Sequence, residues 1–196
     1  MTAPVRIDHV VYATADLSAA AMRFDEEVGT TSVDGGRHDG MGTHNRIVPL
    51  ANGFVELLAI ADAEEAIRSE VGVALRSALE AGDGWLSWAI AVPDVGAVAS
   101  ALEISTSSVG RQGMMAHLAG VAEAMAEPGL PFFIERRGPR PGPPRDHLPA
   151  ITWVVVSGDT QRLERWLAVG LLPVRVVPGE PALRAVAIGA AELRSP

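Results

Sequence analysis

The stretch that decides the fold is 5–28, VRIDHVVYATADLSAAAMRFDEEV. Its first ten residues are rich in β-branched and aromatic side chains, which favour a strand. Asp16 follows, and its carboxylate can accept hydrogen bonds from the free backbone N–H groups of a helix start. The Ala-rich residues up to Phe24 are compatible with a helix that packs on a sheet, and Gly29 supplies its stop. The stretch therefore predicts a strand, a cap and a helix.

The residues that follow predict a short strand, a hairpin and a second helix. A Gly-rich loop at 34–43 leads into apolar runs at 46–50 and 54–60, which are separated by Ala-Asn-Gly. Asn-Gly between β-rich runs is the strongest short hairpin signal. The loop glycines are expected to permit a tight, left-handed chain path. Residues 62–81 carry apolar side chains at four-residue spacing and predict an amphipathic helix.

The same strand, Asp and helix pattern occurs again at 85–102. Asp94 in this pattern lies 78 residues after Asp16. The triplet Phe-Ile-Glu at 133–135 lies 79 residues after Phe-Val-Glu at 54–56. Two offsets that agree within one residue indicate an internal duplication.

The last part of the chain opens with a third copy of this pattern at 151–168. Two strands are expected after it, at 173–177 and 182–188, joined by a turn rich in Pro and Gly. Between the second and third copies lies 136–149, which contains five prolines. Proline cannot donate a hydrogen bond to a sheet, so this segment is expected to be an extended connection.

Composition excludes several classes of protein. The chain has 196 residues, of which 48% are hydrophobic, and its 16 basic and 24 acidic residues give a net charge of −8. It is too apolar for a disordered protein, and its acidic charge argues against nucleic-acid binding. The absence of cysteine excludes disulfides and thiolate metal sites and fits a reducing compartment. With neither a secretion signal nor an apolar run of about 18 residues, we expect a cytoplasmic protein that contacts no membrane.

The repeated unit resembles the vicinal oxygen chelate superfamily, specifically its glyoxalase-like branch. The resemblance is carried by four segments: Ile7 to Tyr12 with Asp16 and Leu17, Arg37 to Leu50, Phe54 to Leu58, and Leu130 to Glu135. It covers most of 5–137, and a weaker partial module follows from residue 150.

The resemblance implies an α+β fold in which repeated βαβββ modules form a curved, cup-shaped mixed sheet with flanking helices. We therefore expect a first module with its connecting helix at 1–82 and a second module at 83–138. A Pro-rich connection is expected at 139–149. A partial third module, packed on the same body, is expected at 150–196.

The resemblance also implies a divalent metal held by the first and last strands of each module. It nominates His9 and Glu56 in the first module and Glu135 in the second. Ser87 occupies the fourth position, opposite His9, and a neutral hydroxyl is a poor ligand, so the ligand set is incomplete. An imidazole and two carboxylates suit Zn, Ni, Fe or Mn. Glu56 and Glu135 are also the candidate catalytic residues, because a displaced carboxylate can act as a base.

An alternative to metal binding is ion pairing. Glu56 and Glu135 each interrupt an apolar strand, and a buried carboxylate is costly unless it is paired, hydrated or bound to metal. Their alternative partners are Arg46, Arg136 and Arg137. The candidate pocket residues are Asn45, Arg46, Trp88 and His117. For Trp88 a core position is the alternative, and for His117 a partly exposed strand position.

Two functions of different classes are compatible with this sequence. The first is a divalent-metal-dependent lyase, isomerase or dioxygenase-type enzyme that acts on a small oxygenated molecule. The second is a metal-free protein of the same fold that sequesters a hydrophobic small molecule, motivated by Ser87 and by the Trp and Met content. Fold alone does not fix the reaction. The expected partner is a small-molecule substrate or ligand, and the chain is expected to be a monomer or a homodimer.

Overall fold

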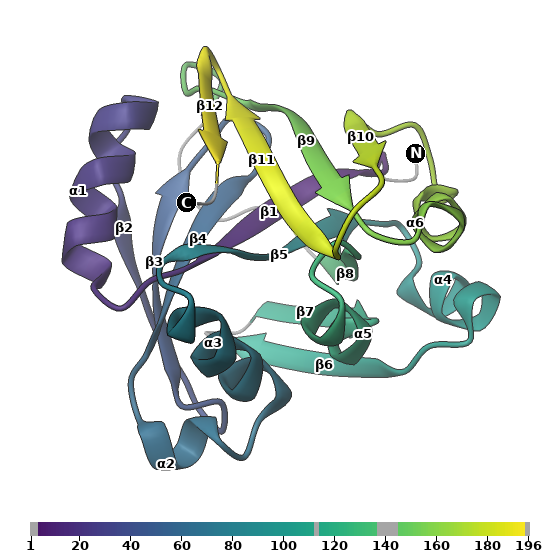
Figure 1. Ribbon diagram of the computed structural model, residues 1–196, viewed down its shortest axis with the longest axis horizontal. Coiled ribbons are helices and arrows are strands. Elements are labelled where there is room, and N and C mark those ends of the chain that lie inside the picture. The colour runs from purple at the N-terminus through teal and green to yellow at the C-terminus, as the bar shows by residue number, and fades with distance from the viewer. Residues whose placement is uncertain (1–3, 112–113, 137–144, 195–196) are drawn as a thin grey trace.

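The computed structural model describes residues 4–111, 114–136 and 145–194 and contains two sheets (Figure 1). Arg137, one of the predicted ion-pair partners, and residues 139–144 of the predicted Pro-rich connection lie outside the described residues. None of the helices in the described residues is both long enough and apolar enough to cross a membrane.

The first sheet has eight strands, which come from two stretches of the chain. The first stretch contributes β1 (Arg6–Ala13), α1 (Leu17–Val28), β2 (Val33–His38), β3 (Thr43–Pro49) and β4 (Phe54–Ile60). Two helices follow, α2 (Ala63–Ala66) and α3 (Glu70–Glu80). The second stretch contributes β5 (Gly84–Ala91), α4 (Val95–Leu102), β6 (Thr106–Arg111), β7 (Met114–Ala119), α5 (Val121–Ala126) and β8 (Phe132–Arg136).

Strand pairing gives the sheet a symmetrical order. The order is β2-β3-β4-β1-β5-β8-β7-β6, with β1 and β5 antiparallel at the centre. Each central strand is parallel to the last strand of its own stretch, β1 to β4 and β5 to β8. The α+β fold with a mixed sheet and flanking helices, predicted above, is thus confirmed. Helix α5 has no counterpart between β3 and β4.

Aspartates start the helices as the sequence indicates. Asp16 accepts hydrogen bonds from the backbone N–H groups of Ser18 and Ala19 at the start of α1, and Asp94 accepts one at the start of α4. Helix α1 ends at Gly29, whose φ of 72° lies in the left-handed region that favours glycine.

The second sheet is built by the C-terminal residues. It contains β9 (Ile151–Ser157), β10 (Val174–Val177), β11 (Ala182–Ile188) and β12 (Ala191–Arg194), with α6 (Thr160–Leu167) after β9. Its order is β10-β9-β11-β12, so the strand after the helix lies beside the first strand. In the first sheet, β2 lies three places from β1. The C-terminal sheet therefore shares the strand–helix start of the two modules but not their strand order.

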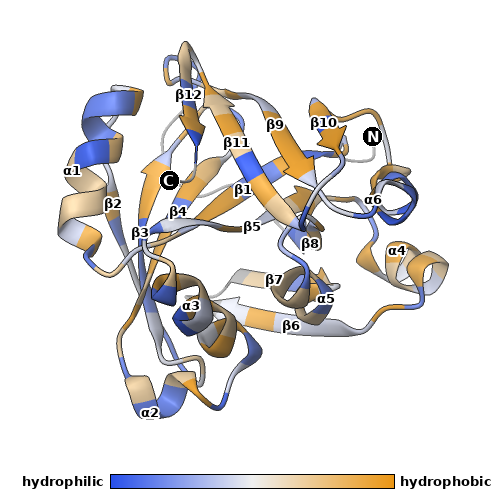
Figure 2. Ribbon diagram, in the orientation of Figure 1, coloured by the Kyte–Doolittle hydropathy of each residue, from blue (hydrophilic) through white to orange (hydrophobic). Residues whose placement is uncertain are grey.

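The main core lies between the two sheets. It joins one face of the eight-stranded sheet to α1, α4, α6 and the inner face of β9–β11, and it contains the fully buried Trp88 and Trp166. Hydrogen bonds also connect the sheets, because the side chain of Asn52 bonds to both the N–H and the C=O of Ile151, each at 2.8 Å. Figure 2 shows mostly apolar residues along β4, β9 and β11 and polar residues on α6.

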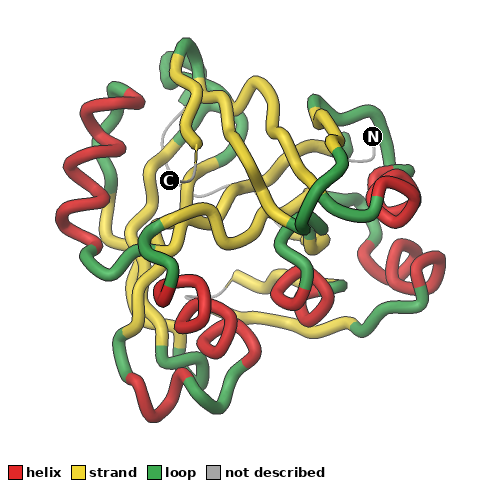
Figure 3. The backbone as a smooth tube through the Cα atoms, viewed as in Figure 1, coloured by secondary structure: helices red, strands yellow, loops and turns green. Residues whose placement is uncertain are grey.

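The other face of the eight-stranded sheet is the concave one, and it carries two smaller apolar clusters. Helix α3 packs there through Leu75, which belongs to one apolar cluster with Val11 and Leu58. Helix α5 packs beside it through Ala124, which belongs to the other cluster with Phe132. Figure 1 shows α3 and α5 on the side of the sheet away from β9–β12, and Figure 3 shows the helices outside the strand layers. We call this concave face the cup face.

Candidate functional site

His9 and Glu56 lie together on the cup face. β1 and β4 pair with Val11 opposite Glu56, and His9 shares a face with Val11 because side chains alternate along a strand. The His9 ring stacks on Phe54 with 4.5 Å between centroids and an interplanar angle of 6°. Its Nε2 atom lies 3.8 Å from Oε2 of Glu56. The structure therefore brings two of the predicted site residues into one place.

A β-bulge places Asp8 behind His9. The register between β1 and β5 shifts between Ile7 and His9, so Asp8 has no partner in that ladder. Asp8 is fully buried, and its Oδ2 atom lies 3.0 Å from Nδ1 of His9. The same oxygen accepts hydrogen bonds from Nε and Nη2 of Arg136, at 3.1 and 2.8 Å.

This environment keeps the Asp8 carboxylate ionised. Burial acts to raise the pKa of Asp8, but the hydrogen bond and charge of His9, together with those of Arg136, outweigh it and hold the pKa well below its ordinary value of 3.8. An ionised carboxylate can only accept hydrogen bonds, so Nδ1 of His9 donates to it. His9 is therefore fixed with Nε2 directed at Glu56.

Three side chains surround the carboxylate of Glu56. Nδ2 of Asn45 donates to Oε1, and Nε2 of His38 lies 3.6 Å from the same oxygen. Oε2 has no hydrogen-bond partner among the described residues, since its 3.8 Å separation from His9 exceeds hydrogen-bond distance. The Glu56 side chain is 15% exposed and that of His38 is 22% exposed, so the site opens towards solvent on the His38 side.

His38 is the site residue that sequence reasoning missed. The sequence predicts a Gly-rich loop at 34–43, whereas the structure places His38 at the end of β2, opposite Thr43 on β3. Its Nδ1 atom lies 2.9 Å from the hydroxyl of Thr43, which orients the ring. The sequence signal for a turn at this place is the pair of glycines Gly40 and Gly42. Their positive φ angles of 78° and 66° show that the turn between the two strands lies there.

The structure does not bring Glu135 to His9 and Glu56. Glu135 pairs with His117 on β7, and the neighbouring Phe133 belongs to the main core on the opposite face of the sheet. Its Oε2 atom accepts a hydrogen bond of 3.2 Å from the backbone N–H of Val95 at the start of α4. A carboxylate is favourable at that helix end, so this position has a structural explanation.

Strand pairing identifies which residue of the second module corresponds to Glu56. At the centre of the sheet Val10 pairs with Trp88, so Val11 on β1 and Ala89 on β5 occupy equivalent places. Glu56 lies beside Val11, and Phe132 lies beside Ala89. Phe132 is therefore the structural counterpart of Glu56, three residues before the one that the triplet alignment indicates.

The same relation gives the counterparts of Asp8 and His9. The second register shift in the β1–β5 ladder lies opposite Leu86, and Ser87 follows it as His9 follows Asp8. Ser87 is fully buried, and its hydroxyl has no hydrogen-bond partner in the part of the chain that the structure describes. One half of the cup face thus carries Asp8, His9 and Glu56, and the other carries Leu86, Ser87 and Phe132.

The predicted pocket residues divide between the two faces. Asn45 is 6% exposed and contacts Glu56 on the cup face. Arg46 pairs instead with Asp34 at 2.5 Å, away from Glu56. Trp88 occupies the main core, where its Nε1 donates to the carbonyl of Gly129 at 3.1 Å. His117 is half-buried on the face of Glu135, with Nδ1 2.9 Å from the hydroxyl of Ser108.

The residues present do not fit the four-ligand metal site of the superfamily. Two of its positions hold His9 and Glu56, while the other two hold the hydroxyl of Ser87 and the ring of Phe132. Within 4–111, 114–136 and 145–194, no group of three or more His, Asp or Glu is arranged to hold a metal ion.

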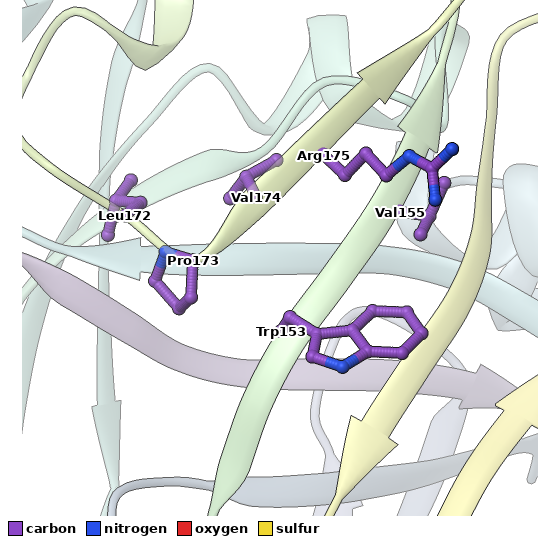
Figure 4. Close-up of a pocket in the computed structure, with 6 residues that line it drawn as sticks. All are labelled: Trp153, Val155, Leu172, Pro173, Val174 and Arg175. Carbon is purple, nitrogen blue, oxygen red and sulfur yellow. The ribbon is translucent and has the colours of Figure 1, made fainter.

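A surface pocket of about 370 Å³ lies elsewhere, on the C-terminal sheet (Figure 4). It is formed by β9, β10 and the residues before β10: Trp153, Val155, Leu172, Pro173, Val174 and Arg175. None of the site residues predicted from the sequence lines it.

Comparison with protein families identifies one match. The model of the family described as Glyoxalase-like domain matches residues 7–170. Comparison with curated proteins gives no match.

Solved structures show the same fold at low sequence identity. A hypothetical protein from Staphylococcus aureus is 14% identical with a TM-score of 0.68, over 94% of this chain and 91% of that one. Methylmalonyl-CoA epimerase from Mycobacterium tuberculosis is 18% identical with a TM-score of 0.50, over 69% of this chain and 89% of that one. A hypothetical protein from Bacillus halodurans is 11% identical with a TM-score of 0.51, over 72% and 99%.

Proposed function

Because the chain belongs to the glyoxalase-like domain family of the vicinal oxygen chelate superfamily, we propose that it is an enzyme that transfers a proton on a small oxygenated molecule. Glu56 is the base in this proposal, and the reaction is of the isomerase or lyase type. The observation that carries it is the Oε2 atom of Glu56, which accepts no hydrogen bond within the described residues and faces Nε2 of His9 at 3.8 Å on the cup face.

Glu56 is placed to remove a proton from carbon. Asn45 holds Oε1, so the carboxylate is fixed in one orientation and Oε2 remains available. Phe54 and Phe132 both contact the His9 ring, and these aromatic walls reduce the access of water. A positioned carboxylate in such surroundings contributes about 10²–10⁴-fold to a rate as a general base.

His9 is placed to form a hydrogen bond with an oxygen of the same molecule. The Asp8 carboxylate accepts a hydrogen bond from Nδ1–H, which leaves Nε2 for a hydrogen bond to the substrate. A carbonyl or hydroxyl oxygen near Nε2 brings the neighbouring carbon close to Oε2 of Glu56. Removal of a proton from that carbon by Glu56 places negative charge on the oxygen. Nε2 stabilises this charge when the ring carries a proton on both nitrogens, because the imidazolium then donates from Nδ1 to Asp8 and from Nε2 to the oxygen.

Proton exchange in D₂O tests this function. Dihydroxyacetone and hydroxypyruvate both carry a CH₂ group beside a carbonyl, and ¹H NMR follows the loss of its signal as deuterium enters. We expect the protein to accelerate exchange of at least one of them above the buffer rate, and Glu56→Gln to lower this acceleration at least 100-fold, in the range of a lost general base. Exchange at the buffer rate with both compounds, or equal exchange by Glu56→Gln, would overturn the proposal.

A metal-free binding function is the second candidate. It is favoured by the apolar half of the cup face, where Leu86, Ser87 and Phe132 stand at the places of Asp8, His9 and Glu56. Binding of either compound without any exchange, and with equal affinity in Glu56→Gln, would favour this candidate.

A further inference from the structure

We propose that Arg136 and Arg6 form an anion site at the edge of the cup face, so that the bound molecule carries a carboxylate group. This inference rests on the proposed function, because it names the chemical class of the molecule that Glu56 acts on.

Two guanidinium groups share one carboxylate. Nη1 of Arg6 lies 3.1 Å from Oδ1 of Asp8, and Nη2 of Arg136 lies 2.8 Å from Oδ2. Neither arginine forms an ion pair with another carboxylate of the described residues. The cluster therefore has one positive charge more than Asp8 balances, in a chain whose net charge is −8. A negatively charged ligand could balance this remaining positive charge.

The arginines remain accessible although Asp8 is not. The Asp8 side chain is 0% exposed, whereas those of Arg6 and Arg136 are 34% and 37% exposed. Nη1 of Arg136 has no hydrogen-bond partner in the described part of the chain. Asp8 thus fixes one edge of this guanidinium and leaves its outer edge open. A fixed guanidinium binds a carboxylate through paired hydrogen bonds with little further loss of side-chain freedom.

The position of Arg136 connects this site to Glu56. Arg136 pairs with Ala116, which belongs to the cup-face cluster of Phe132. Its guanidinium carbon lies 5.7 Å from the centroid of the Phe54 ring, the ring on which His9 stacks. A carboxylate on Arg136 would therefore lie one aromatic ring away from His9.

Calorimetric titration tests the anion site without requiring catalysis. The probes are malonate, inorganic phosphate and the neutral malonamide, which has the shape of malonate without its charge. We expect malonate to bind the wild-type protein, malonamide to bind at least tenfold more weakly, and phosphate to bind more weakly than malonate. Equal binding of malonamide, or tighter binding of phosphate than of malonate, would overturn the carboxylate assignment.

Variants locate the binding. Arg136→Gln is expected to lower the affinity for malonate at least tenfold. The affinity of Arg136→Lys is expected to fall between those of Arg136→Gln and the wild type, because lysine keeps the charge but lacks the paired N–H groups of the guanidinium. The matched control is Arg162→Gln, which removes an exposed guanidinium paired with Glu127 at 3.1 Å. If Arg136→Gln does not fold, the variant Asp8→Asn/Arg136→Gln removes both charges together and should bind no malonate. Unchanged affinity in the folded Arg136 variants would contradict the site.

The two proposals fail separately. Glu56→Gln is expected to lose proton exchange, while its malonate binding still depends on Arg136. Malonate binding that depends on Arg136, without accelerated exchange of either hydroxypyruvate or dihydroxyacetone, would support the anion site and overturn the enzymatic function. Exchange of neutral dihydroxyacetone as fast as that of hydroxypyruvate, unaffected by Arg136→Gln, would support the enzymatic function and overturn the anion site.

Discussion

At the scale of single residues, the protein is defined by a difference between two equivalent positions. Asp8 and His9 follow one register shift of the central strand pair, and Leu86 and Ser87 follow the other. One pair carries charge and a ring nitrogen, and the other carries an aliphatic side chain and a buried hydroxyl. The imidazole and carboxylate of the proposed catalytic pair therefore come from one half of the cup face, while the equivalent positions in the other half carry no such groups.

Asp8 is expected to make stability depend on pH. Its pKa is lowered in the folded protein relative to the ordinary 3.8, so the unfolded chain binds more protons as the pH falls. The stabilisation by the Asp8 carboxylate is therefore full above the unfolded pKa and declines as the pH drops below it. Asp8→Asn should lower the free energy of unfolding by about 3 kcal/mol at pH 6, as is typical when a buried ion pair loses one partner.

Urea unfolding between pH 6 and pH 3 measures this effect. The difference between wild type and Asp8→Asn is expected to shrink as the pH falls below 4. A difference that stays constant over the whole range would show that Asp8 is not held ionised by His9 and Arg136.

The register of β8 makes a prediction about metal binding. If Phe132 is the counterpart of Glu56, the double variant Ser87→His/Phe132→Glu completes the four-ligand set with His9 and Glu56. We expect it to bind Ni²⁺ at least tenfold more tightly than Ser87→His alone, in a calorimetric titration. Ser87→His alone keeps Glu135, so an equal affinity of the two variants would favour Glu135 as the ligand and contradict the register.

At the scale of elements, most strands and helices and the aspartate caps were predictable from the sequence. The single helix predicted at 62–81 is instead two helices, α2 and α3, and neither α5 nor β12 was predicted. His9 and Glu56 were predicted together because the resemblance to the superfamily nominates the first and last strands of the first module as the source of its site residues. Glu135 was matched to Glu56 by spacing, yet α5 between β7 and β8 makes the second module unequal to the first. Because side chains alternate along a strand, the structural difference of three residues places Glu135 on the opposite face.

The turn between β2 and β3 offers a test of backbone geometry. Gly42 has a φ of 66°, and a Cβ atom there would lie 2.2 Å from the backbone N of Ala66. Gly29 has a similar φ of 72° with nothing within 4 Å of the same position. We expect Gly29→Ala to cost about 1 kcal/mol for the left-handed conformation, and Gly42→Ala about 3 kcal/mol because steric overlap is added.

Chemical denaturation of the two alanine variants gives the comparison. Gly42→Ala should also weaken whatever binds near Glu56, because this turn positions His38 and Thr43. Equal stability of the two variants would mean that α2 does not pack against the turn as described.

At the scale of the whole molecule, the two sheets share one core. Trp166 on α6 is 1% exposed and its ring contacts Phe133 on β8, with 5.6 Å between centroids. The C-terminal residues therefore pack against β8 on the face of the eight-stranded sheet that is opposite the cup face. Single cooperative unfolding is expected for a core that spans both sheets.

Replacement of Trp166 tests this shared core. Trp166→Ala should lower the free energy of unfolding by about 3–5 kcal/mol, the usual cost of a large aromatic removed from a core. Leu171→Ala is the matched control, because Leu171 is fully exposed and should change little. Far-UV and near-UV circular dichroism should report one transition at the same urea concentration. Two separate transitions would show that the C-terminal sheet unfolds on its own.

The most direct measurement compares two glutamates in the D₂O exchange of hydroxypyruvate. Glu56 lies beside His9 on the cup face, whereas Glu135 bonds to the start of α4 on the other face. We expect Glu56→Gln to lose at least 100-fold in exchange rate, as for a lost general base, and Glu135→Gln to keep the wild-type rate. Equal rates for wild type and Glu56→Gln, or a comparable loss in a folded Glu135→Gln, would contradict the assignment of the chemistry to the first module.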